Sequence, residues 1–356
     1  MESKKALDKI IKKSRVHFYK PIQLAEILYH NRTESKIKLD DIESYRNISK
    51  KWRDDISKRL VGRVSTSSQK FQDNLFDKNA MPPQLLKELG EINNKESGIV
   101  ENYIYNKLKE RLAMISNIIE YINRSGIESF ALDILLSKFT QEPGLKRSVD
   151  KIYEIITYAL FNTIVRVLKI EVSMGIKNTD REEVENFSEF VTSILGISKG
   201  KTSATVPARI FRMGRTNAAD RGLDILTNFG TVIQVKHLSL SEELAEEITD
   251  NISADRIILI CLDGEKELIE KIINQTSFGN RIHGIITFSV LNEWYKMCFS
   301  KKYKNILGKQ ILEDLVMEFN NEFPTSSEIG NFLQERKYDK SVLKTKNQFH
   351  TFTAKK

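Results

Sequence analysis

The stretch DRGLDILTNFGTVIQVKHL, residues 220–238, contains two runs of apolar and β-branched residues on either side of an Asn-Phe-Gly loop. Asn and Gly in a short loop between two such runs are typical of a β-hairpin. We therefore predict antiparallel strands at 223–227 and 231–238.

Three polar side chains interrupt these apolar runs. Asp224 lies near the start of the first predicted strand, and Gln234 and Lys236 lie two residues apart on the second. Because side chains alternate along a strand, Gln234 and Lys236 point to the same face. The carboxylate of Asp224, the amide of Gln234 and the backbone carbonyl of Val235 offer the oxygen ligands that a hard divalent cation prefers. Lys236 could orient an attacking water. The hairpin therefore predicts a metal-dependent phosphodiesterase site.

At these residues the chain resembles the PD-(D/E)XK nuclease superfamily. The signature acid is Asp224 and the triplet is Gln234-Val235-Lys236, with Gln in place of Asp or Glu and Leu223 in place of Pro. The Gln variant is similar to that of Mrr-like restriction nucleases. The resemblance implies that Asp224, Gln234 and Lys236 are catalytic and that Asp224 and Gln234 hold Mg²⁺.

A helix is expected at 181–195, just before the hairpin, with apolar residues at helical spacing. In the nuclease superfamily, the helix before the hairpin often supplies one more acid to the metal site. Glu189 or Glu185 could be that acid, although glutamates on a helix are more often simply exposed to solvent.

The elements after the hairpin fit the same core. A helix is predicted at 241–250, a buried strand at 256–262, a helix at 265–274 and a strand at 282–288. We therefore predict an α/β catalytic domain at 146–323, in which helices flank a mixed sheet. This is the core that the resemblance implies.

The N-terminal part, residues 1–145, is predicted to be mainly helical and to serve DNA recognition or dimerisation. Residues 14–76 combine helical patterns, a basic helix and a segment rich in hydroxyls and amides. Two interpretations remain open for them: a winged helix-turn-helix, or a solvated basic helix followed by a loop. Residues 324–356 are expected to form a basic C-terminal tail.

Cationic and polar residues in two segments are candidates for contacts to phosphates and base edges, because guanidinium, ammonium, hydroxyl and amide groups make such contacts. One segment contains the predicted basic helix, and the other immediately precedes the hairpin. The candidates are Arg46, Lys50, Lys51, Arg53, Arg59, Arg63, Ser67, Ser68, Gln69, Arg212 and Arg215.

Composition agrees with a soluble protein that binds a polyanion. The 356 residues carry a formal net charge of +8, which favours nucleic acid as a partner, although a merely basic protein would also fit. Cys261 and Cys298 have no spacing typical of a zinc site or a disulfide framework. The longest apolar stretch, 155–165, is too short to span a bilayer, so we expect a cytoplasmic protein without a membrane segment.

The whole chain resembles type II restriction endonucleases of the HaeII family. The stretches 14–28 (SRVHFYKPIQLAEIL) and 44–76 (SYRNISKKWRDDISKRLVGRVSTSSQKFQDNLF) carry this resemblance together with the hairpin. It implies Mg²⁺-dependent cleavage of double-stranded DNA at a short GC-containing palindrome with a GCGC core. A palindrome implies a twofold homodimer, and a restriction enzyme implies a cognate DNA methyltransferase in the host.

Two alternatives stay open at this stage. One is an Mrr-like nuclease that attacks modified DNA, or a repair nuclease that recognises DNA structure. The other is a DNA-binding protein without catalysis, in which Gln234 marks a decayed site.

Overall fold

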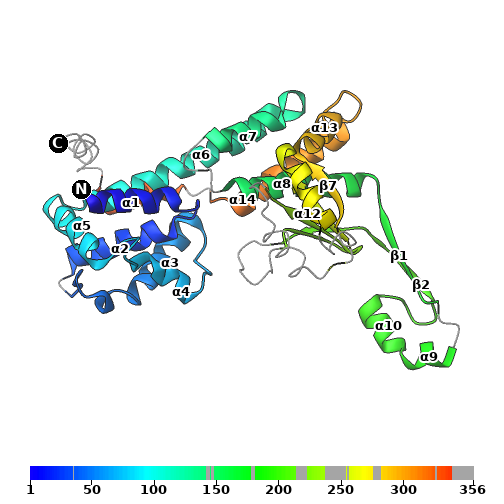
Figure 1. Cartoon of the computed structure of the whole chain (residues 1–356), viewed down its shortest axis with the longest axis horizontal. Coiled ribbons are helices and arrows are strands. Elements are labelled where there is room, and N and C mark those ends of the chain that lie inside the picture. The colour runs from blue at the N-terminus through cyan, green and yellow to red at the C-terminus, as the bar shows by residue number, and fades with distance from the viewer. Residues whose placement is uncertain are drawn as a thin grey trace.

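The structure is a computed structural model that describes residues 1–34, 36–141, 145, 148–177, 181–213, 223–236, 254, 256–275, 282–324 and 327–338. Figure 1 shows an elongated molecule with a helical body at the N-terminal end and a sheet-containing body at the other. A long helix runs between the two bodies, and a narrow arm projects from the second.

The N-terminal body consists of helices, as the sequence predicts. Its elements are α1 (Glu2–Lys13), α2 (Tyr19–Thr33), η1 (Ile42–Ser44), α3 (Ile48–Val61), α4 (Gln69–Asp73), η2 (Asn74–Phe76) and α5 (Pro83–Lys95). Residues 62–76, which follow the basic helix α3, contain α4 and η2 and no strand. The β-hairpin wing considered for 14–76 is therefore not formed by this segment.

Part of the predicted C-terminal tail belongs to the N-terminal body. Helix α15 (Glu328–Glu335) places Phe332 in the same buried cluster as Ile22 and Tyr105. The Asn102 amide donates a hydrogen bond to the carbonyl of Tyr338, at 3.2 Å. Residues 327–338 are therefore packed into the core rather than forming a free tail, and residues 339–356 lie outside the described part.

Helix α6 (Ile99–Ser129) joins the two bodies. Its first half contributes Ile104 and Leu108 to the N-terminal core, and its second half contributes Ile115 and Ile122 to the core under the sheet. A kink at Gly126, with a φ of 56°, precedes α7 (Leu132–Gln141). Packing thus divides the chain within α6, whereas the sequence places the boundary at 145.

The second body contains a mixed five-stranded sheet in the order β3 (Ile210–Arg212), β4 (Ile225–Thr227), β5 (Thr231–Val235), β6 (Arg256–Cys261) and β7 (Ile282–Thr287). The first three strands are antiparallel, and β5, β6 and β7 are parallel. The predicted hairpin is confirmed as β4 and β5, with Gly230 at a φ of 82° in its turn. The strands predicted at 256–262 and 282–288 are also confirmed.

Helices cover both faces of this sheet. Ile233 and Val235 point into a core shared with α8 (Val149–Val167), α13 (Phe288–Cys298), η6 (Lys304–Gly308) and α14 (Lys309–Glu322). On the other face, Val232 packs with Ile269 of α12 (Lys266–Gln275), which follows the short turn η4 (Asp263–Glu265). The predicted mixed sheet flanked by helices is confirmed. The helix predicted at 241–250 lies outside the described residues.

An arm that the sequence did not predict emerges after α8. Strands β1 (Glu171–Gly175) and β2 (Ser203–Pro207) pair with each other in a separate two-stranded sheet. The arm carries α9 (Arg181–Asn186) and α10 (Ser188–Leu195) at its far end (Figure 1). The helix predicted at 181–195 is therefore present as two helices separated at Phe187.

Both Cys261 and Cys298 are buried free thiols. Of the helices that the structure describes, none combines the length and apolar character needed to cross a membrane.

Candidate active site

Asp224 is held where β3, β4 and β5 meet. It comes directly before β4, and its Oδ2 accepts a hydrogen bond from the backbone N–H of Val235, at 2.8 Å. Its own carbonyl accepts a hydrogen bond from the N–H of Met213, also at 2.8 Å. The predicted acid is therefore fixed against the Gln234-Val235-Lys236 triplet on the neighbouring strand.

A second acid, Glu154 of α8, lies beside Asp224. Its side chain is buried, and both of its carboxylate oxygens accept hydrogen bonds from Lys151 Nζ, at 2.8 and 2.7 Å. Glu154 and Asp224 also share a side-chain hydrogen bond. The sequence prediction missed this residue.

The two carboxyl groups have perturbed pKa values. Burial, followed by the negative charge of Asp224, raises the pKa of Glu154 to about 8, although Lys151 acts in the opposite direction. Burial also raises the pKa of Asp224, against the N–H of Val235 and the charge of Lys236. Because two adjacent carboxylates repel each other when both are ionised, Glu154 and Asp224 favour a shared proton or a bound cation.

Gln234 and Lys236 complete the group. Gln234 is only 1% exposed, and its Oε1 has no hydrogen-bond partner in the part of the chain that the structure describes. Because an unpaired buried carbonyl is costly, this oxygen is available for a cation or a water. The backbone N–H of Lys236 donates to the carbonyl of Ile260 at 2.8 Å. The ammonium of Lys236 lies close enough to Asp224 to lower the pKa of that acid.

Arg212 of β3 links the acid Glu154 to helix α14. Its Nε donates to Glu318 at 2.8 Å and its Nη1 donates to Glu322 at 2.9 Å, both on α14. Nη1 also lies 3.9 Å from Glu154. Burial acts to lower the pKa of Arg212, but Glu322 and Glu318 outweigh it and raise the pKa overall. Arg212 was predicted to contact DNA, yet its side chain is 3% exposed, so we assign it a positioning role.

The donor set fits a hard cation. Within the described residues no group of three or more His, Cys, Asp and Glu side chains could bind a metal ion. The available ligands are two carboxylates and one amide oxygen, from Asp224, Glu154 and Gln234. Such an oxygen set suits Mg²⁺, which keeps several water ligands and is commonly bound through one or two carboxylates.

Glu189 and Glu185 are not brought to this site. Glu189 is an exposed residue of α10, and Glu185 an exposed residue of α9. Both helices lie at the far end of the arm, away from the sheet (Figure 1). The reason is topological, because residues 181–195 are carried outward by β1 and β2, and α8 is the helix that packs against the sheet. The signal for Glu154 was a lone acid inside the apolar run of residues 152–160, IYEIITYAL.

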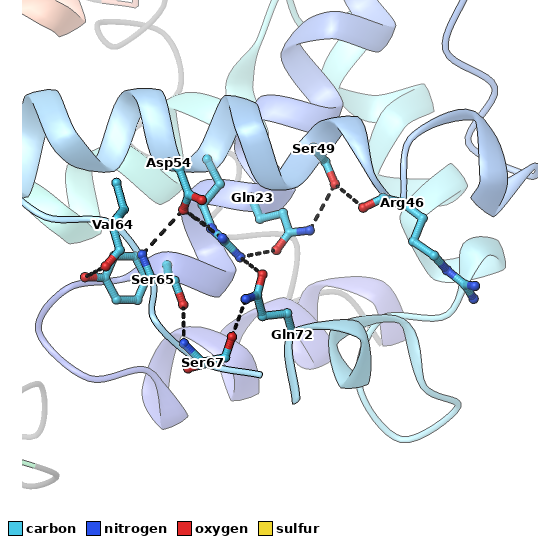
Figure 2. A network of polar contacts seen from close by, with 10 residues as sticks. Gln23, Arg46, Ser49, Asp54, Val64, Ser65, Ser67 and Gln72 are labelled. Carbon is cyan, nitrogen blue, oxygen red and sulfur yellow. Dashed lines mark hydrogen bonds and ion pairs between the residues drawn. The ribbon is translucent and has the colours of Figure 1, made fainter. Parts of the chain in front are cut away.

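Two predicted DNA contacts have partners within the N-terminal body. Arg53 is buried and donates hydrogen bonds to Asp54, Gln23 and Gln72; Figure 2 shows the network that these side chains form. Arg59 forms a bidentate pair with Glu335 of α15, with distances of 2.6 and 2.5 Å. Arg53 therefore stabilises the fold from the interior, whereas the Arg59–Glu335 pair lies at the surface.

The other candidates are divided between paired, exposed and undescribed positions. Lys50 pairs with Asp73 at 2.7 Å, and Arg46 pairs with Glu43 at 3.0 Å while remaining 38% exposed. Lys51 and Ser68 are exposed, and Arg63 and Ser67 are half-buried. In Figure 2, Ser67 lies beside Gln72, whose amide donates to its carbonyl. The side chain of Gln69 and all of Arg215 lie outside the described part.

Comparison with known proteins covers nearly the whole chain. The family model described as HaeII restriction endonuclease matches residues 3–338. The chain is similar to the type II restriction enzyme HaeII of Haemophilus aegyptius, with 47% identity over 342 residues, which are 96% of this chain and 97% of the relative. It is also similar to the type II restriction enzyme NgoBI of Neisseria gonorrhoeae, with 46% identity over 344 residues and the same two coverages. No solved structure matches the chain.

Proposed function

Because the chain belongs to the HaeII restriction endonuclease family, we propose that it is a type II restriction endonuclease that hydrolyses DNA at the Asp224–Lys236 site. Enzymes of this type are site-specific deoxyribonucleases. The observation that carries the assignment of the site is the convergence of Asp224, buried Glu154 and Lys236 around one hairpin. This arrangement supports a place in the PD-(D/E)XK superfamily.

Asp224, Glu154 and the Oε1 of Gln234 would hold Mg²⁺. The bound ion would activate a water and neutralise charge on the scissile phosphate. The ammonium of Lys236 orients the attacking water and stabilises the charge that develops on the phosphate oxygens. Arg212 keeps Glu154 in place through its ion pairs with α14. The products are a 5′-phosphate and a 3′-hydroxyl.

The proposed substrate is double-stranded DNA with a short GC-containing palindrome, with GCGC as its core. A palindromic target has twofold symmetry, so we propose a homodimer in which each subunit cuts one strand. Among the predicted DNA contacts of the N-terminal body, Lys51, Arg59 and Ser68 are exposed and Arg46 is partly exposed. A cognate DNA methyltransferase would protect the host genome.

Digestion of unmethylated phage DNA tests this function. The purified protein is incubated with Mg²⁺, with EDTA as a control and with the Asp224→Asn variant in parallel, and the fragment ends are sequenced. We expect discrete ends that share one palindrome, only for the unaltered protein with Mg²⁺. Binding without cleavage of unmodified DNA would instead favour a modification-dependent nuclease or a protein without catalysis.

A further inference from the structure

The tip of the arm presents an apolar helix face with nothing packed on it. Residues 187, 190, 191, 194 and 195 recur at the spacing of a single helix stripe. Phe187, Phe190 and Ile194 are 64, 55 and 68% exposed, and α10 has no buried residue. A helix that shows a complete apolar stripe to solvent usually marks a protein contact.

A matching apolar cavity of about 720 Å³ lies at the base of the arm. Its floor is the sheet face with Ile210, Ile233 and Ile258, and its rim includes Leu168, Met297 and Ile306. These three rim residues are 66, 58 and 56% exposed. The cavity opens on the sheet face that α8 and α13 border.

The apolar face of α10 and the cavity lie at opposite ends of the arm within one chain. Leu168, in the cavity rim, comes just before β1, whereas α10 follows at the far end of the same arm (Figure 1). The β1–β2 pairing is continuous from Glu171 and Pro207 to Gly175 and Ser203. A paired ladder holds the tip away from its own base, so a chain cannot fill its own cavity without unpairing these strands.

Charge indicates which partner suits the tip. Residues 181–195 contain one arginine and four glutamates, a net charge of −3 in a chain whose total is +8. An acidic tip is repelled by DNA phosphates. Exposed lysines are instead adjacent in sequence to residues that line the cavity: Lys169 follows Leu168, and Lys301 and Lys302 precede Tyr303. An acidic apolar helix therefore complements an apolar cavity whose lining is adjacent in sequence to lysines.

We propose that two copies of this chain exchange their arms, each placing α10 in the cavity at the base of the other's arm. The same two surfaces then meet twice about one twofold axis, as an isologous interface requires. Phe190 and Ile194 enter the cavity, and the glutamates of α9 and α10 face the lysines of the rim. The inference rests on the proposed homodimer and specifies how it is held together.

The molar mass in solution tests the exchange. We expect the unaltered protein to be a dimer and the variant Phe190→Asp/Ile194→Asp to have a dimer dissociation constant at least about tenfold higher, because charges replace central apolar anchors. Both residues are exposed in one chain, so the variant should fold, which circular dichroism would verify. Ile134→Asp, at a residue 45% exposed on α7, is the matched control and should leave the dimer intact.

Cross-linking distinguishes arm exchange from other contacts of the tip. Because the free thiol of Cys298 lines the cavity, Ile194→Cys and Ile306→Cys are each made in a Cys298→Ala background. The two variants are mixed and treated with a short bis-maleimide; Cys261 is buried, and the Cys298→Ala protein is the control. We expect a covalent pair only in the mixture. Cross-linking of Ile194→Cys with itself would overturn the proposal in favour of tip-to-tip pairing.

Each further outcome also has one meaning. A double variant that stays fully dimeric would overturn arm exchange but leave the homodimer standing. An unaltered protein that is monomeric, alone and on DNA, would overturn both. Cleavage of phage DNA in either case would leave the proposed nuclease activity untouched.

Discussion

Replacing Glu154 with glutamine should stabilise the protein at alkaline pH. The folded-state pKa of Glu154 is about 8, above its usual 4.5, so between these values the folded state binds more protons than the unfolded state. The free energy of unfolding therefore falls as the pH rises from 4.5 to 8. At 1.36 kcal/mol per pKa unit, the full effect is on the order of 5 kcal/mol. Because Asp224 shares the proton, we expect glutamine to recover about 2–3 kcal/mol at pH 8.

Thermal unfolding in EDTA at several pH values between 5 and 8.5 is the assay. We expect the melting temperatures of the unaltered protein and Glu154→Gln to agree near pH 5. At pH 8 the variant should melt about 5–10 °C higher, from the usual shift per kcal/mol for a domain of this size.

Glu293→Gln is the matched control, because Glu293 also pairs with a lysine three residues away but is 67% exposed. It should follow the unaltered protein at every pH. If the melting temperatures of Glu154→Gln and the unaltered protein change in parallel with pH, the inference that folding raises the pKa of Glu154 is refuted.

Three further outcomes follow from the site and from the N-terminal body. Saturating Mg²⁺ should raise the melting temperature more at pH 8 than at pH 5.5, because protons compete for the acid pair, and Asp224→Asn should remove the effect. Arg53→Ala should lower the free energy of unfolding by about 2–4 kcal/mol, measured by urea denaturation, because the hydrogen bonds of a buried guanidinium are lost. Lys51→Ala, on the same helix but exposed, should leave stability unchanged. It should reduce the slope of the logarithm of DNA affinity against the logarithm of salt concentration by about one, which corresponds to one lost phosphate contact. An Lys51→Ala protein with reduced stability, or an Arg53→Ala protein with normal stability, would contradict this division.

Local signals were sufficient for the hairpin and its polar residues. The Asn-Phe-Gly turn and the alternation of residues 231–235 determine β4 and β5 without reference to the rest of the chain. Asp224 and Lys236 follow from the same register, because each is adjacent to a strand end. Their approach to each other was therefore predictable from sequence.

Glu154 required tertiary information. Its helix was visible as an apolar run, but which helix packs against the hairpin depends on the path of the intervening chain. Residues 171–207 form an arm whose strands pair across 36 residues, from Glu171 to Pro207. No turn signal indicates that pairing, so the sequence places the helix at 181–195 near the site and offers Glu189 or Glu185 as its acid.

Two arginines show the same limit. The sequence suggests that both Arg212 and Arg53 are surface cations. Glu318, an acid partner of Arg212, follows it by 106 residues. Arg53 pairs with the adjacent Asp54, but its amide partners Gln23 and Gln72 lie 30 and 19 residues away. Sequence composition records a positive charge but not the acid that neutralises it. The ion pairs of Arg212 with Glu318 and Glu322 of α14, and its 3% exposure, show that it belongs to the interior.

The single-turnover cleavage rate of Lys236→Ala tests the central claim most directly, measured beside its affinity for the same DNA. Lys236 is partly exposed just after β5, so its removal should not disturb the fold. We predict a rate at least about 100-fold lower, with an almost unchanged dissociation constant, because an interaction made mainly in the transition state is lost. A Lys236→Ala protein that cleaves at the rate of the unaltered enzyme would contradict the assignment of this site.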